Sequence, residues 1–163
     1  MKDAKRFILA GNAYFTIENN KGEHYTFRVR KPEEGPLAGL DAYFIGVLSG
    51  PDNTKDYTYM GLLDAREGVI RQTKKSAVST EATSWKVAQW VVKRVWGNIP
   101  FPDGYKLHHE GRCGRCGRLL TVGKSVETGF GDECAKFMGF SLTPEEPDKV
   151  AKYETTQIKG GLT

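Results

Sequence analysis

Apolar and polar side chains alternate along most of residues 7–72, and a period of two is that of a β-strand with one buried face. Tyr25, Phe27 and Val29 show the alternation clearly, because each is flanked by polar residues. The turn-forming sequence Asn-Asn-Lys-Gly at 19–22 joins this strand to the preceding one in a hairpin. The strands predicted in this way occupy residues 13–18, 24–30, 43–48, 57–63 and 68–71. They indicate an antiparallel sheet of about five strands.

The period changes to that of a helix between Ser79 and Trp96. Several residues from 79 to 84 are suitable N-caps, Glu81 would lie in the first turn, and Gly97 would end the helix. The apolar side chains fall within one arc of about 180°, which predicts the buried face. They are Trp85, Val87, Ala88, Val91, Val92, Val95 and Trp96. The opposite side, which we expect to face water, carries Lys86, Trp90, Lys93 and Arg94.

Composition divides the chain into three segments. Residues 1–100 hold the predicted sheet and helix, and a proline-containing linker then leads into a compact, cysteine-containing segment at 101–142. Residues 143–163 are expected to form a polar C-terminal tail. The predicted fold class is therefore α+β: an antiparallel sheet with one packed helix, followed by a small Cys3His module similar to a zinc finger.

Three cysteines and a pair of histidines provide the sharpest chemical signal. Cys113 and Cys116 have the spacing with which two thiolates hold one ion from a tight turn, and Cys134 follows at the start of a short predicted helix. Thiolates select zinc or iron, and a tetrahedral site needs a fourth ligand. His109 is the expected fourth ligand, with His108 as the alternative. A closed set of this kind predicts one structural zinc ion that stabilises a segment too small to fold alone.

The string HEGRCGRCGRLLT runs from His109 to Thr121, and Gly129-Phe-Gly131 and Cys134 follow it. This pattern resembles a small zinc-binding module of unknown function seen mainly in phage-encoded proteins. The upstream segments 11–16, 25–30 and 49–59 resemble the domain that often precedes that module. The resemblance implies the same zinc ligands and a phage origin, and it implies no reaction.

Positive and negative charge are segregated along the chain, although the net charge is only +4. Residues 71–96 carry a net charge of +5, whereas residues 32–70 carry −5. The cations of the basic block that contains Trp90, and the arginines spaced around the cysteine turn, are candidates for contact with phosphates. Trp90 is a candidate for stacking on an unpaired base. These residues are Arg71, Lys74, Lys75, Lys86, Lys93, Arg94, Arg112, Arg115 and Arg118. The sequence therefore favours a protein that binds nucleic acid.

A second hypothesis gives more weight to the acidic segment 32–70. Its seven carboxylates could imitate phosphates or meet a basic partner. The protein would then be a phage accessory protein that binds and inhibits a host protein, such as a component of a defence or nucleic-acid-processing system. Charge alone does not distinguish the two hypotheses, and the sequence does not reveal the oligomeric state.

Catalysis and a membrane location are not expected. His108-x-Glu110 before the cysteine pair looks superficially like the ligand set of zinc deaminases, but only two residues separate the halves, which deaminases place on separate helices. The apolar run at 7–11 is too short for a signal peptide, and no run approaches the roughly 20 residues that cross a bilayer. We therefore expect a cytoplasmic protein, in the host cell if it is phage-encoded.

Overall fold

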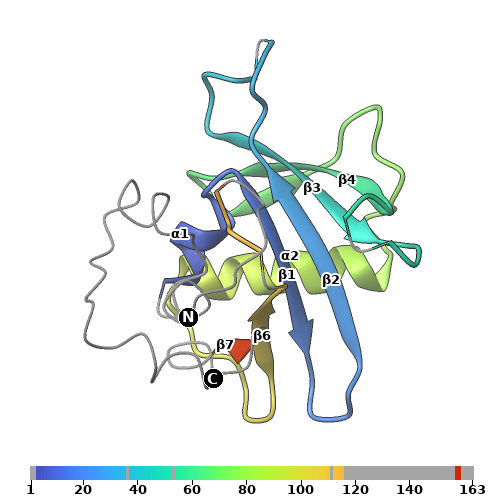
Figure 1. Cartoon of the computed structure of the whole chain (residues 1–163), viewed down its shortest axis with the longest axis vertical. Coiled ribbons are helices and arrows are strands. Elements are labelled where there is room, and N and C mark those ends of the chain that lie inside the picture. The colour runs from blue at the N-terminus through green and yellow to red at the C-terminus, as the bar shows by residue number, and fades with distance from the viewer. Residues whose placement is uncertain (1–2, 36, 53, 111, 116–156, 159–163) are drawn as a thin grey trace.

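The computed structural model of the chain describes residues 3–35, 37–52, 54–110, 112–115 and 157–158. Its strands form one sheet in the order β5-β4-β3-β2-β1-β6-β7, in which all paired neighbours are antiparallel (Figure 1). The elements in chain order are α1 (Ala4–Ile8), β1 (Asn12–Glu18), β2 (His24–Arg30), β3 (Ala42–Leu48), β4 (Tyr57–Asp64), β5 (Val69–Arg71), α2 (Thr83–Trp96), β6 (Lys106–His109) and β7 (Gln157–Ile158). The predicted α+β class is confirmed.

The five strands predicted from the alternation correspond to β1 to β5, which lie side by side in order of sequence. β6 is a strand that the sequence did not predict. It pairs with β1, which lies about ninety residues earlier in the chain, and local alternation gives no sign of such a distant partner. Phe15 lies opposite His109, and Ile17 lies opposite Leu107. The sheet therefore includes residues beyond position 100, in the segment assigned from the sequence to the zinc module.

α1 is a second element that the period of two did not predict. Asp3 caps it by accepting a hydrogen bond from the Arg6 N–H at 3.0 Å. Its Phe7 and Ile8 are fully buried in the core, so the apolar residues at 7–11 belong to a short helix and the turn after it. α1 thus covers the core beside the start of β1.

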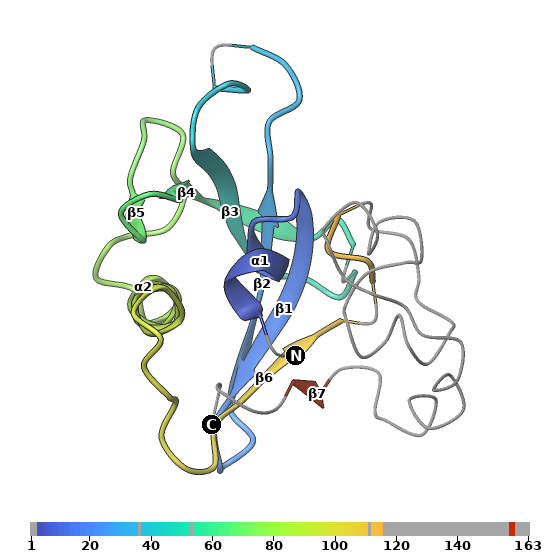
Figure 2. The same ribbon diagram turned by 90° about the vertical axis from the view of Figure 1, so that its left-hand side faces the viewer.

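The hydrophobic core lies between one face of the sheet and the two helices. Figure 2 shows α2 end on, with α1 on the same side of β1. The buried side chains of α2 are Trp85, Ala88, Val91, Val92 and Val95, as the helical arc predicts. The sheet contributes its alternate residues, including Phe15, Ile17, Phe27, Val29, Ile45 and Leu63. Within the described ranges, neither helix is long and apolar enough to span a membrane.

The start of α2 differs from the prediction. The helix begins at Thr83 with Ala82 at the N-cap position, and no side chain accepts a hydrogen bond there. Glu81 precedes the first turn instead of lying in it, and its carboxylate is 3.6 Å from the Lys86 ammonium. The serines and threonines before the helix are therefore not its caps, and burial of the apolar face supplies most of its stability.

The sheet face opposite α2 carries a network of polar and aromatic side chains. The Thr16 and Thr26 hydroxyls are 2.6 Å apart, and the Thr16 hydroxyl also donates to the Glu110 carboxylate at 3.0 Å. The Arg28 guanidinium lies 4.9 Å from the centre of the Tyr57 ring. Burial, followed by the nearby Glu110 carboxylate, raises the pKa of Tyr57 above its usual range. The Tyr57 ring also approaches the Tyr14 ring, with ring centres 5.7 Å apart. Tyrosines of different strands therefore contact each other on this face.

Candidate functional site

The two histidines proposed as alternative zinc ligands lie on opposite faces of the sheet, because neighbours in a strand alternate. His109 is only 1% exposed, and its ring centre is 6.0 Å from that of Phe7 in α1. His108 is paired with Thr16, and its Nε2 lies 3.1 Å from the Glu18 carboxylate. Only His109 therefore faces the core.

Cys113 lies on the same side of the molecule as His109. It is 0% exposed and belongs to the hydrophobic core cluster that contains Phe7. Gly114 packs so closely against Phe7 that a Cβ at this position would lie 2.6 Å from the ring. The Gly114 carbonyl accepts a hydrogen bond from the Asn12 N–H at 2.7 Å. The first half of the cysteine turn is thus fixed against α1 and the start of β1.

The other two predicted ligands, Cys116 and Cys134, lie outside the described residues, as does Arg118. In the part of the chain that is described, no three His, Cys, Asp or Glu side chains gather into a metal site. His109 supplies an imidazole and Cys113 a soft thiol, and both side chains are buried. These two kinds of donor suit zinc. That they share a metal ion stays a prediction.

The predicted cations lie on separate elements of the fold. Lys86, Lys93 and Arg94 lie on α2 at positions four residues before, three after and four after Trp90, so they flank this ring on the helix. Lys74 and Lys75 are exposed in the loop that precedes α2, and Arg71 ends β5. Arg112 and Arg115 belong to the segment that follows β6, whose Gly114 packs against Phe7 of α1. The described cations that were predicted to bind therefore come from three stretches of the chain: α2, the stretch from β5 to α2, and the segment after β6.

Trp90 is partly buried, which corrects the prediction that its ring stands exposed in water. Its ring centre lies 5.3 Å from that of Phe101 and 5.2 Å from that of Tyr105. The Arg94 guanidinium is 4.8 Å from the Trp90 ring centre. Phe101 and Tyr105 belong to the connection from α2 to β6, residues that were assigned from the sequence to the cysteine-containing segment. That connection folds back against the helix and covers part of the tryptophan.

The remaining edge of Trp90 borders a groove of about 430 Å³ between α2 and the β1–β2 hairpin. Tyr25 and Tyr105 also line this groove, and Lys86 lies at its side with Val87. We call it the Trp90 groove. Three aromatic rings and one ammonium group therefore meet at a single recess, with Lys93 and Arg94 on the same helix.

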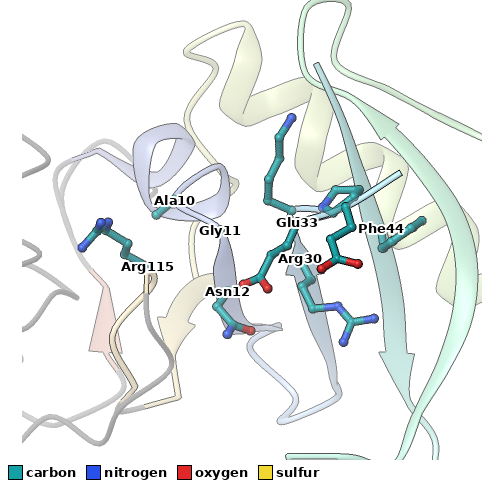
Figure 3. A pocket seen from close by; sticks show the side chains of 10 residues that line it. Ala10, Gly11, Asn12, Arg30, Glu33, Phe44 and Arg115 are labelled. Carbon is teal, nitrogen blue, oxygen red and sulfur yellow. The ribbon is translucent and has the colours of Figure 1, made fainter. Parts of the chain in front are cut away.

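A second groove, of about 820 Å³, lies beside the start of β1 and the end of β2 (Figure 3). Arg115 borders it on one side and Phe44 on the other, with Gly11, Arg30 and Glu33 between them. We call it the Arg30 groove. The sequence analysis named only Arg115 among these residues. Arg30 and Phe44 were missed because their cross-strand pairing depends on the register of β2 and β3.

Most aspartates of the acidic segment 32–70 are engaged in the fold. Asp52 accepts hydrogen bonds from the Thr54 hydroxyl and N–H at 2.6 and 2.8 Å, and the hydroxyl bond is the main reason why the pKa of Asp52 is lowered. Asp64 accepts from the N–H groups of Arg66 and Glu67, which lowers its pKa as well. These carboxylates stabilise turns, so they are poorly placed to imitate phosphates.

A family model described as a family of unknown function (DUF6011) matches residues 108–139. This match covers the predicted zinc module, beginning within β6 at His108 and continuing past Cys134. No curated protein and no solved structure matches the chain. The matched stretch is therefore the segment that carries the histidine pair and all three cysteines.

Proposed function

We propose that this protein binds single-stranded nucleic acid through the Trp90 groove and the cations of α2, and that a structural zinc ion stabilises the segment after β6. The observation that carries the proposal is the meeting of Tyr25, Trp90 and Tyr105 at one groove beside Lys86. Aromatic rings accept the face of any unpaired base, and nearby cations contact its phosphates. The protein acts by binding and not by catalysis.

The groove can hold a base because its rings are already ordered. Phe101 and Tyr105 pack against Trp90 from the connection that follows α2, and Arg94 lies over its ring. A base entering the groove therefore loses little of its binding energy to ordering of the protein. Stacking of one base on an aromatic side chain contributes about 1–3 kcal/mol. Lys93 is exposed and has no ion-pair partner in the described chain, so it adds a charge for the backbone of the strand.

The zinc ion of this proposal is held by His109, Cys113, Cys116 and Cys134. When bound, it supplies a tetrahedral cross-link and no catalytic chemistry, because protein ligands fill all four positions. The burial of His109 and Cys113 beside Phe7 supports this assignment. The ion would fasten the segment after β6 to the sheet.

The test measures binding of a short labelled single-stranded oligonucleotide by fluorescence anisotropy at low and moderate salt. Trp90→Leu keeps an apolar side chain but removes the stacking surface, so we expect affinity to fall by about tenfold or more. Trp90→Phe retains a ring and should bind nearly as well as the natural protein. Lys93→Gln should weaken binding and reduce the salt dependence by about one phosphate contact.

Arg66→Gln is the matched control, since Arg66 is an exposed cation in the turn between β4 and β5. Its affinity should equal that of the natural protein. Negligible binding at low salt, or equal binding by the Trp90→Leu and Arg66→Gln variants, would refute the proposal. Recovery of one host protein from nuclease-treated lysate, with no oligonucleotide binding, would favour the inhibitor hypothesis instead.

A further inference from the structure

The Arg30 groove brings three kinds of side chain together. Arg30 and Arg115 are cationic, Phe44 is a flat ring, and Glu33 and Glu34 are carboxylates. We propose that this groove binds one nucleotide, with its phosphate at Arg30, its base against Phe44 and an amino group of the base at the carboxylates. This inference does not rest on the proposed role of the Trp90 groove, because the two grooves share no residue.

Arg30 is the cation most available to a ligand. It is exposed at the end of β2, and its guanidinium lies 5.9 Å from the centre of the Phe44 ring. It has no ion-pair partner among the described residues. The neighbouring Lys31 is different, because its ammonium donates to the Leu40 carbonyl and lies 4.7 Å from the Tyr43 ring centre. A phosphate would therefore be met by Arg30 and not by Lys31.

Arg115 reaches the same groove from a distant part of the chain. The Gly114 carbonyl accepts a hydrogen bond from the Asn12 N–H, and the Arg115 carbonyl lies 3.5 Å from where a Cβ of Gly11 would be. These backbone contacts hold the segment 112–115 against the start of β1. Figure 3 shows Arg115 at the edge of the groove opposite Phe44, with its side chain directed away from Arg30. The backbone of this segment therefore closes that edge of the groove, and Arg30 is the cation that meets the phosphate.

Phe44 supplies the surface for a base. Its ring meets that of Tyr59 with centres 6.0 Å apart and an interplanar angle of 77°, an edge-to-face contact that fixes its orientation. The ring is partly buried and borders the groove, so it is held in place before a ligand arrives. The groove volume of about 820 Å³ falls within the roughly 300–1,000 Å³ of small-molecule sites.

The two glutamates narrow the class of ligand. Glu33 and Glu34 are exposed and would repel a bare phosphate, which disfavours a simple anion site. A carboxylate accepts hydrogen bonds from the exocyclic amino group of a base, as in the contact between glutamate and cytosine N4. A ligand with a phosphate at one end and an amino-bearing base at the other satisfies both charges. Cytidine nucleotides should therefore bind better than uridine nucleotides, whose base lacks that amino group.

The test titrates the full chain with cytidine monophosphate, uridine monophosphate, cytidine and a short oligocytidylate by isothermal calorimetry. We expect saturable binding of cytidine monophosphate, with weaker binding of the uridine nucleotide and of cytidine. Arg30→Gln should weaken cytidine monophosphate binding by about tenfold through loss of a charged hydrogen bond. Replacing both glutamates by alanine, E33A with E34A, removes the acceptors for the base amino group and should abolish the preference for cytidine over uridine.

Arg66→Gln and Trp90→Leu are the controls, and neither should change binding of cytidine monophosphate. If the oligocytidylate binds in an Arg30-dependent way but the mononucleotide does not, the site takes its nucleotide from a strand, and the inference stands. If neither binds, or if Arg30→Gln and Arg66→Gln have equal effects, it is overturned. Loss of oligonucleotide affinity in Trp90→Leu alone bears on the proposed function and leaves this site unaffected.

Discussion

Neighbouring residues of β1 and β2 point to opposite faces of one sheet, and these two faces have different chemistry. Phe15 and Phe27 face α2 and are fully buried in the core. Thr16 and Thr26, the residues next to them in each strand, face the other way and share a hydrogen bond. The first face is closed by apolar packing, whereas the second is organised by hydrogen bonds and by arginines against aromatic rings.

This difference shows how one short strand serves two purposes. The core face fixes the register, because a slip by one residue would turn Phe15 and Phe27 toward the polar side. The opposite face can then present Arg28 and Arg30 in fixed positions. β6 repeats this division, since His109 faces the core and His108 faces Glu18. Two substitution pairs compare the two faces, and a third pair concerns the loop beside the polar face.

The largest effect is expected for Phe27→Ala on the core face. Phe27 is 0% exposed, and truncation of a buried phenylalanine costs about 3–5 kcal/mol because it leaves a cavity. Thr26→Val on the opposite face keeps the side-chain shape and removes only the hydroxyl bonded to Thr16, so it should cost about 1 kcal/mol. Unfolding by denaturant measures both variants. Equal losses of stability would show that the two faces contribute alike.

The next effect concerns zinc and compares the two histidines of β6. One ligand accounts for about a quarter of roughly 10–16 kcal/mol of zinc binding, so His109→Gln should weaken zinc affinity by about 100-fold. His108→Gln should leave the affinity unchanged, because His108 lies on the other face beside Glu18. Competition with a chromophoric chelator measures the affinity, and metal analysis of the purified natural protein should give about one zinc per chain. Greater loss in His108→Gln would reverse the assignment.

The smallest effect is expected at Asp52, in the loop that borders the polar face. The Thr54 carbonyl accepts hydrogen bonds from the Tyr14 hydroxyl and the Arg28 guanidinium at 3.5 and 3.4 Å, and the Asp52 carboxylate fixes Thr54. Thr54→Val removes the hydroxyl donor that contributes most to the low pKa of Asp52, so that pKa should rise toward its ordinary value of 3.8. Carboxyl chemical shifts followed against pH measure this change.

The same carboxylate predicts the direction of a pH effect. Because the folded pKa of Asp52 is lowered, its contribution to stability is present above the ordinary pKa and is lost as pH falls through the lowered value. The Asp52→Asn variant should therefore be slightly less stable than the natural protein at neutral pH. The difference should vanish in strong acid, and a difference that grew on acidification would contradict this account.

The predicted parts of the fold are those with a local signature. β1 to β5 follow from alternation and turns, and the buried side of α2 follows from helical spacing. The helix start was wrong, since Ala82 and not a hydroxyl residue occupies the N-cap position. α1 was missed because five residues are too few to show a helical period.

The candidate site was predicted only where its residues adjoin in sequence. The cations around Trp90 on α2 follow from helical spacing, but the packing of Phe101 and Tyr105 against its ring does not. The Arg30 groove joins residues from β2, β3 and the segment after β6, so no single stretch of sequence contains its pattern. The metal assignment of Cys116 and Cys134 stays a prediction.

The sequence by itself determined which residues form strands, which form the long helix, and which side of each is apolar, because these depend on spacings of two to four residues. It also predicts a zinc-binding donor set in the cysteine segment, and this stays a prediction. The tertiary structure decided that β6 pairs with β1, that His109 and not His108 faces the core, and that Arg115 borders the same groove as Arg30 and Phe44. Those outcomes depend on contacts between distant segments, which leave no periodic signal in the chain.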